Sequence, residues 1–318
     1  MVVSFMTASN GTNKKARARR QHIVPRWLLV NFEDGAGTLW AYAKGRPVRP
    51  SGAVNECSQR DFYEYELNGK STANRYEDWL GVIESDANSV FKAVITRQQL
   101  TQHDAEIWST FVAALFMRTR KVRKQISDGM VQRFKKQTDD PAFIRNMQYE
   151  LLQQGELVAA EDLKKEIDKL REAMDSSPSF YHVSGLPRHT RSLAQAVLTK
   201  QWHTLEAPDG KAFVISDCPV VTVAINGRQI APGAGFANPN VAILLPITPK
   251  AIFVASPPDI GWKTIITAVG VDSVNRLLVQ FGHQNVYSNT NSSEMQLLVD
   301  LELDALKYGV NTFLPAAS

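Results

Sequence analysis

Four polar side chains that lie far apart in the chain have the residue types of a hydrolytic site: His22, Glu84, Arg118 and Asp217. Histidine titrates near neutral pH and can act as a general acid or base. An arginine guanidinium stays charged and can hold an anion through two N–H groups at once. Carboxylates can transfer protons or bind Mg²⁺, and the sequence leaves both the use of a metal and the identity of any cofactor open.

Arg118 carries the strongest signal of the four, because it lies on the apolar stripe of an expected helix. It follows Leu115 by three residues and precedes Val122 by four. Burying a guanidinium without a partner is costly, so Arg118 should meet a carboxylate or face a cleft. The alternative is an arginine at the edge of the stripe that extends its charged end into water.

Asp217 is the expected partner of Arg118. It lies in the segment 216–219, a polar break between two apolar runs that closes with Pro219, which cannot donate to a strand ladder. The alternative is a carboxylate that only closes a turn ahead of Pro219. Ser216 lacks the flanking glycines of a nucleophile elbow, and no base is identified for Cys218.

His22 and the glutamates also have structural alternatives. A lone histidine is more often a packing residue with a hydrogen bond than an acid or base. Glu77 and Glu84 lie seven residues apart, so they share one face of a helix at about 10 Å. Glu84 borders the apolar side of that helix, whereas a solvated face is the alternative for both. The other histidines show no zinc-binding spacing, so no metal site is predicted from them.

A basic run near the N-terminus can bind phosphates without reading sequence. Its members are Lys14, Lys15, Arg17, Arg19 and Arg20, and they supply much of a net charge of +4 over 318 residues. The residues up to 20 are otherwise polar and are expected to form a disordered tail. This charge allows an anionic partner, such as nucleic acid or a phosphate ligand, without requiring one.

The composition is that of an ordinary globular protein, with 44% hydrophobic and 21% charged residues. Two cysteines cannot form a disulfide framework and fit a reducing compartment. No apolar run approaches the ~18 residues of a membrane-spanning helix, and the first residues are too short for a signal peptide. We therefore expect a soluble, cytoplasmic protein without a membrane partner, and leave its oligomeric state open.

The elements that must position these residues change character along the chain. Alternating patterns predict strands at residues 38–43 and 62–66. Helical spacing then predicts helices at 74–95, from 101 onward, and at 141–154, 159–174 and 186–202. From residue 203 the pattern is β, with a hairpin signal at Asn226, and the chain closes with a helix at 272–282, a strand at 285–287 and a last helix. The sequence thus predicts an α+β fold: one domain over residues 21–318, with a mixed or antiparallel sheet built from both ends of the chain and a helical middle lobe at about 74–202.

Several of these pieces together resemble one family, the domain of unknown function 4238, found mainly in bacteria. The matching residues run from Gln21 to Ser288 and include Gln21, His22, Val24 and Pro25, then Asp61 to Tyr63, the helix around 76–84, residues 111–118 with Arg123, Ser216, Asp217 and Pro219, Leu245, Pro246 and Pro249, Asn275, and residues 286–288. Ile23 departs from the pattern, because the family often carries an aromatic residue there. If that aromatic residue helps to shape a site, the site of this chain is altered. The resemblance implies no known reaction.

The favoured interpretation is a hydrolase acting on a nucleic acid or another phosphate-containing substrate, with His22 as acid or base and Arg118 holding the anion. The alternative is a non-catalytic module that binds nucleic acid or protein through the basic run. In that case the four polar residues form a structural network. The two interpretations differ in one observable: a site needs side chains that converge on an open cleft, whereas a network is sealed by apolar neighbours.

Overall fold

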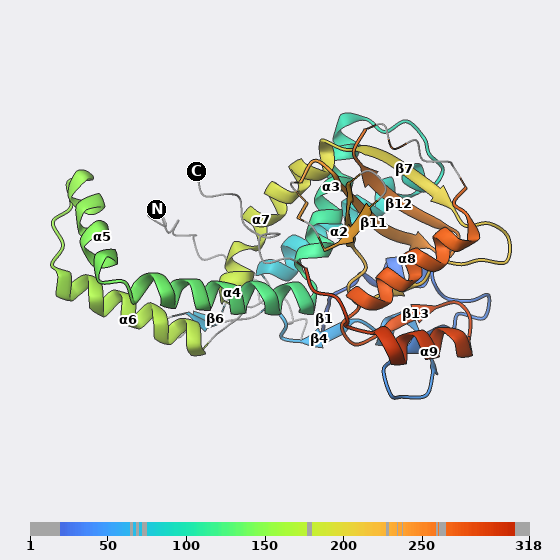
Figure 1. Cartoon of the computed structure of the whole chain (residues 1–318), viewed down its shortest axis with the longest axis horizontal. Coiled ribbons are helices and arrows are strands. Elements are labelled where there is room, and N and C mark those ends of the chain that lie inside the picture. The colour runs from blue at the N-terminus through green and yellow to red at the C-terminus, as the bar shows by residue number, and fades with distance from the viewer. Residues whose placement is uncertain are drawn as a thin grey trace.

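The computed structural model describes residues 20–63, 66–67, 70–71, 75–176, 180–226, 229–233, 235–236, 238–258, 260 and 265–308. The tail expected at residues 1–20 therefore lies outside the described residues except for Arg20. The described part has an α+β fold, as the sequence predicts, with helices in the middle and antiparallel sheets. Figure 1 shows a body of sheets and helices and, to its left, a helical arm.

The larger sheet is antiparallel, with the strand order β10-β9-β11-β12-β7. Its strands are β7 (Gln201–Glu206), β9 (Val221–Asn226), β10 (Gln229–Pro232), β11 (Val241–Thr248) and β12 (Ala251–Ser256). Asn226 pairs with Gln229, which confirms the expected hairpin. All of β12 and all but the last residue of β11 are buried, so these two strands are covered on both faces.

The second sheet joins the two ends of the chain. It has the order β3-β2-β13-β8 and consists of β2 (Leu39–Tyr42), β3 (Arg49–Ser51), β8 (Ile215–Ser216) and β13 (Val286–Ser288). Two shorter pairs are β1 (Arg20–His22) with β4 (Ser58–Arg60), and β5 (Glu66–Leu67) with β6 (Lys70–Ser71). The strand predicted at 62–66 is wrong in its first residues. Asp61 takes a positive φ of 54°, and the chain turns there after β4.

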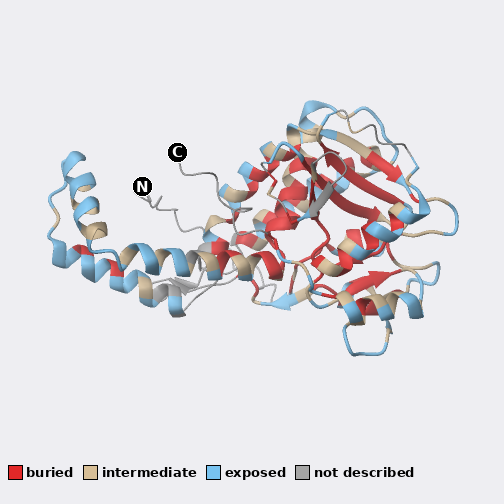
Figure 2. Cartoon of the chain, viewed as in Figure 1, coloured by how far each residue is buried: buried red, intermediate tan, exposed pale blue. Residues whose placement is uncertain are grey.

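Helices α2 (Arg75–Ile95), α3 (Gln102–Met117) and α7 (Phe180–Leu198) pack together beside the larger sheet (Figure 1). The buried Trp108 of α3 meets the ring of Phe253 on β12 at 5.8 Å between centroids, which fixes α3 on the sheet. Figure 2 shows this helix and the sheet strands as the buried centre of the body. The shorter helices are α1 (Arg26–Val30), η1 (Ala53–Asn55), α8 (Ala268–Phe281) and α9 (Ser293–Glu302). The helix predicted at 186–202 begins earlier, at Phe180, so Pro187 lies inside α7.

The apolar stripe expected to continue past Arg118 is interrupted at that residue. Helix α3 starts with a capping box of Thr101 and Asp104 and ends at Met117. Arg118 is its C-cap, and Thr119 is the N-cap of α4 (Arg120–Thr138), where its side chain accepts a hydrogen bond from the Val122 amide. A threonine that caps a new helix start leaves Arg118 at a junction between two helices.

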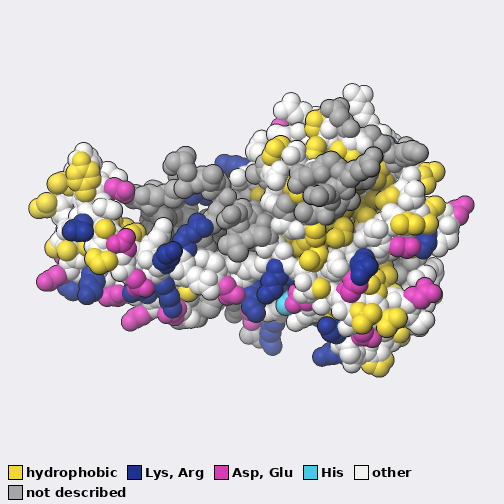
Figure 3. All heavy atoms as spheres, in the orientation of Figure 1, with side chains coloured by type: hydrophobic (Ala, Val, Ile, Leu, Met, Phe, Trp, Pro, Cys, Tyr) yellow, Lys and Arg dark blue, Asp and Glu magenta, His cyan; other side chains and the backbone are white. Residues whose placement is uncertain are grey.

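The arm consists of α4 with α5 (Pro141–Gln153) and α6 (Ala160–Ser176). Helix α5 has no buried residue, and Tyr149, Leu152 and Leu157 are exposed by 65%, 54% and 91%. Apolar side chains accordingly gather at the far end of the arm (Figure 3). Among the residues that the structure describes, no helix is both long and apolar enough to cross a membrane.

Candidate functional site

The strand pair β1–β4 places His22. In its register Arg20 is opposite Arg60, Gln21 opposite Gln59 and His22 opposite Ser58. Side chains alternate along a strand, so Arg20 and His22 point to one face while Gln21 points to the other and is buried. The Gln21 Oε1 accepts a hydrogen bond of 2.7 Å from the amide of Tyr63. The Tyr63 hydroxyl in turn donates to the carbonyl of His22 at 3.2 Å.

Arg118 lies at the α3–α4 junction and is only 1% exposed. Its Nη1 donates to Oε1 of Glu84 on α2 at 2.5 Å, a salt bridge between two neighbouring helices. Its Nε and Nη2 are buried and have no hydrogen-bond partner in the described structure. A buried donor without a partner costs free energy and is rare in native proteins. The two unpaired nitrogens, which form one edge of the guanidinium, are therefore the most unusual feature of this side chain.

Glu77 and Glu84 share one side of α2, seven residues apart, as their spacing predicts. Glu77 is partly buried, and this burial raises the pKa of its carboxyl to about 7. The Arg118 cation opposes the increase in pKa, while the Glu84 charge adds to it. A carboxyl with a pKa near 7 holds and releases a proton at physiological pH, which is the property of a general acid or base.

His22 is half-buried beside the same groups. Burial lowers the pKa of its imidazole, the Glu84 carboxylate raises it, and the charges of Arg118, Arg20 and Arg26 lower it further. The net decrease keeps the ring neutral at pH 7. Its Nε2 is buried without a hydrogen-bond partner in the described structure.

Three of the four predicted residues therefore meet, and Asp217 does not join them. Both Asp217 oxygens accept backbone N–H groups, at 2.7 Å from His283, 2.9 Å from Gln284 and 3.4 Å from Asn285. The expected pair of Arg118 with Asp217 is wrong: Glu84 is the partner of Arg118, and Asp217 instead holds the loop between α8 and β13. Burial raises the pKa of the Asp217 carboxyl, and the N–H groups of His283 and Gln284 oppose that increase.

Two members of the cluster received little weight from the sequence. The sequence left a solvated face open as the alternative for Glu77, although its spacing from Glu84 placed both on one side of the helix. Tyr63 is 2% exposed, and its phenol experiences the charges of Arg118, Glu77 and Glu84. Its place between Phe62 and the turn gave no sign of that position. We refer to His22, Tyr63, Glu77, Glu84 and Arg118 as the Arg118 cluster.

The described residues contain no group of three or more His, Cys, Asp or Glu side chains that could hold a metal ion. In the Arg118 cluster the unpaired N–H edge of Arg118 is buried, and the geometry of a guanidinium edge matches the oxygens of a carboxylate or a phosphate. The cluster therefore combines an unpaired cation edge with groups that can exchange protons.

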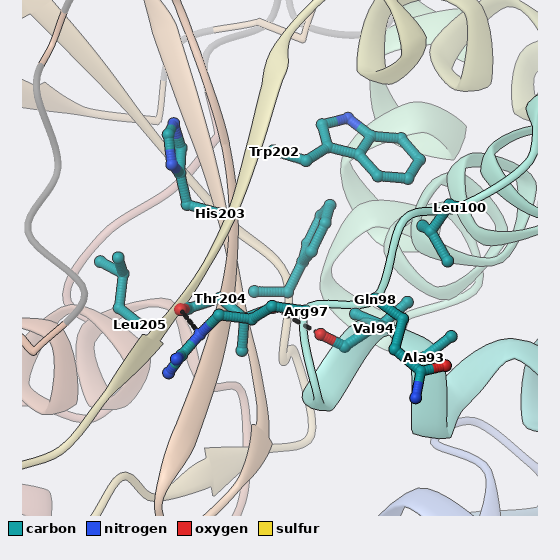
Figure 4. Close-up of a pocket in the computed structure, with 10 residues that line it drawn as sticks. Ala93, Val94, Arg97, Gln98, Leu100, Trp202, His203, Thr204 and Leu205 are labelled. Atoms are coloured by element: carbon teal, nitrogen blue, oxygen red, sulfur yellow. Dashed lines mark hydrogen bonds between the residues drawn. The ribbon is translucent and has the colours of Figure 1, made fainter.

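Two hollows lie elsewhere on the body. One, of about 230 Å³, lies between the end of α2 and β7, and Trp202, Leu100 and Phe253 contribute its apolar wall. Figure 4 shows Arg97 at this hollow, where its Nε donates to the carbonyl of Thr204 at 3.0 Å. The other, of about 610 Å³, is polar and lies beside the loop that Asp217 holds. Neither hollow is lined by a member of the Arg118 cluster.

Comparison with known proteins assigns a family but no activity. Neither the search of curated proteins nor the search of solved structures gives a significant match. One family model, described as a protein of unknown function (DUF4238), matches residues 20–292. That match includes β1, α2, the α3–α4 junction and the Asp217 loop, and therefore every residue discussed above. The chain belongs to the DUF4238 family of proteins of unknown function.

Proposed function

We propose that the Arg118 cluster is the site of a hydrolase that acts on a phosphate-containing substrate. The observation that carries this proposal is the free edge of Arg118, whose Nε and Nη2 are buried without partners. Two parallel N–H groups on a planar cation fit two oxygens of a phosphoryl group. A bound phosphate would satisfy both donors and would remove the free-energy cost of leaving them unpaired.

Glu77 supplies the proton transfer in this proposal. With a pKa of about 7, part of the population is ionised at pH 7 and can take a proton from an attacking water molecule. The oxygen of that water forms a bond to phosphorus while the bond to the leaving oxygen breaks. The protonated Glu77 then returns the proton to the leaving oxygen. Atoms and charge balance with water as the second reactant.

The other members of the cluster orient these two groups. Glu84 accepts the hydrogen bond of Arg118 Nη1 and so orients the guanidinium. Neutral His22 can bind the water or the leaving oxygen through Nε2. Tyr63 attaches β1 to the turn that follows β4 through its hydrogen bond to the His22 carbonyl. Asp217 has a structural role.

A second candidate is a non-catalytic interaction module, in which the same side chains only connect β1, α2 and α3. The salt bridge between Glu84 and the 1% exposed Arg118 favours it, since such a pair also occurs in purely structural networks. The two candidates make different predictions for ligand binding. If these residues form only a structural network, phosphate should not bind to them or stabilise the protein.

The experiment uses the full chain with p-nitrophenyl phosphate and bis(p-nitrophenyl) phosphate, each with and without Mg²⁺. Glu77→Gln should lower kcat by about 10²-fold or more, as expected for the loss of a general base. Arg118→Lys should mainly raise KM, because the two-point contact is lost. The matched controls are Glu150→Gln and Arg145→Lys on the exposed arm helix α5, which should behave like the parent.

Inorganic phosphate provides a readout that does not depend on the choice of substrate. It should raise the Tm of the parent and of Glu77→Gln, but not of Arg118→Lys. Absence of both turnover and a phosphate-dependent increase in Tm would refute the hydrolase and leave the structural network.

A further inference from the structure

Three exposed arginines lie near His22 in the strand pair or in the chain: Arg20 on β1, Arg60 on β4 and Arg26 at the start of α1. We call these three residues the arginine rim. Arg20 and Arg60 are direct partners in the β1–β4 register, so their side chains start from opposite positions on one face of the strand pair. His22 lies two residues from Arg20 and points to that same face. The rim and the Arg118 cluster are therefore adjacent.

Like charges opposite each other in a strand pair are destabilising, so this arrangement needs a reason. Both arginines are exposed. Arg20 uses one nitrogen, Nη2, for the carbonyl of Asn55 and the hydroxyl of Ser58, so Nε and Nη1 take no part in these two hydrogen bonds. Arg60 has only a 3.9 Å contact with Asp61. Among the described residues no acidic side chain forms a salt bridge with Arg20 or Arg26 to offset the repulsion.

The charges of Arg20 and Arg26 also reach into the site, since both lower the pKa of His22. The rim thus extends the positive potential around Arg118 outward along the strand pair. A single phosphate ester needs one anion-binding point, which Arg118 provides. Three further exposed cations next to it fit a polymer that carries a phosphate in each repeating unit.

We propose that the substrate is a nucleic-acid strand, whose reacting phosphate binds Arg118 while neighbouring phosphates bind Arg20, Arg26 and Arg60. This inference rests on the proposed function for the identity of the site and adds the class of its substrate. The rim contacts the backbone only, so binding is independent of base sequence and strongly dependent on salt.

The test measures the binding of a fluorescent 20-nucleotide single strand of mixed sequence to the full chain over a series of salt concentrations. The rim variant carries Arg20→Gln, Arg26→Gln and Arg60→Gln. The matched control carries Arg145→Gln, Lys164→Gln and Arg191→Gln, which remove the same charge from exposed positions of α5, α6 and α7. Both retain the N-terminal basic run, and Tm values verify that each variant is folded.

The rim variant should bind about tenfold more weakly or worse, and its salt slope should fall by about 0.7 for each lost phosphate contact, about 2 in all. The control should keep the parental slope.

The outcomes separate the rim from the hydrolase. Weakened binding by the rim variant, with neither hydrolysis by the parent nor an increase of its Tm with phosphate, would support the rim and refute the proposed function. Equal binding by the rim variant and the control, or no binding by the parent, would refute the rim whatever the hydrolysis assay gives.

Discussion

Arg118 and Asp217 are both almost fully buried, at 1% and 2% exposure, but the structure treats the two charges differently. Asp217 accepts three backbone N–H groups from one loop, so both of its oxygens are occupied. Arg118 makes one side-chain hydrogen bond, to Glu84, and its Nε and Nη2 are left buried and unpaired. Both oxygens of Asp217 are therefore paired, whereas two nitrogens of Arg118 have no acceptor.

This difference shows why burial of a charge is not by itself evidence of a site. A carboxylate filled by backbone N–H groups holds a loop and has no capacity for a ligand. A guanidinium with two free donors does have that capacity. The four predictions below test this contrast, and they begin with the largest expected effect.

Replacing Asp217 by alanine should destabilise the protein most. Three backbone N–H groups would lose their acceptor in a buried place, so the free energy of unfolding should fall by about 3 kcal/mol or more. Urea unfolding of parent and variant measures this difference. A change below about 0.5 kcal/mol would mean that water reaches the loop and replaces Asp217 as the acceptor of its N–H groups.

Arg118→Lys should lower the free energy of unfolding by about 1–3 kcal/mol, because Lys loses the planar contact with Glu84. A double-mutant cycle with Glu84→Gln should show coupling of about 0.5–3 kcal/mol between these residues. The same cycle with Asp217→Asn should show additivity within about 0.5 kcal/mol. Strong coupling of Arg118 to Asp217 would remove the separation of the two regions.

Glu77→Gln should change the pH dependence of stability. The pKa of the Glu77 carboxyl is raised from 4.5 to about 7 in the native protein, so between these values the native state holds a proton that the unfolded chain has lost. The free energy of unfolding of the parent should therefore fall as the pH rises through this window. Glu77 is partly exposed, which reduces the expected loss to about 1–2 kcal/mol.

The glutamine variant lacks this loss, so it should be the more stable protein at pH 8 and should lose that advantage at pH 4.5. Urea unfolding at both pH values tests it, with Glu150→Gln as the control. An equal difference between variant and parent at the two pH values would show that Glu77 has an ordinary pKa. The variant's stability at pH 8 also ensures that any loss of turnover there is not caused by unfolding.

The smallest effect on folding is expected for the N-terminal basic run, of which all but Arg20 lies outside the described residues. Changing Lys14, Lys15, Arg17 and Arg19 to Gln should leave the free energy of unfolding unchanged within about 0.5 kcal/mol. Retention on a DNA or heparin column should weaken and become less dependent on salt. Unchanged retention would leave the arginine rim as the main polyanion contact.

The sequence predicted the fold class because the period of its apolar residues changes clearly from strand to helix and back. It also predicted that Arg118 needs a partner and that Glu84 borders an apolar face. It could not identify that partner. The choice between Glu84 and Asp217 depends on which elements pack together, and residue types alone do not determine that packing.

The missed features have the same origin. The break between α3 and α4 was hidden because the stripe of Leu115, Val122 and Ile126 keeps its helical spacing across Thr119. The pKa of Glu77 depends on the burial of one half of α2. The pairing of Arg20 with Arg60 depends on a strand register between segments about 40 residues apart, which a local pattern cannot supply.

The junction at Thr119 has a mechanical consequence. Helix α4 has 19 residues, so it is about 28 Å long and carries the rest of the arm at its far end. A sideways shift of about 5 Å at that end corresponds to a rotation of only about 10° at the junction, by the same helix length. The first turns of α4 are fixed to the body, since Val122 and Ile126 are buried and Lys121 Nζ donates to the carbonyl of Phe281. A force applied far out on the arm would therefore reach Arg118 only through these packed turns.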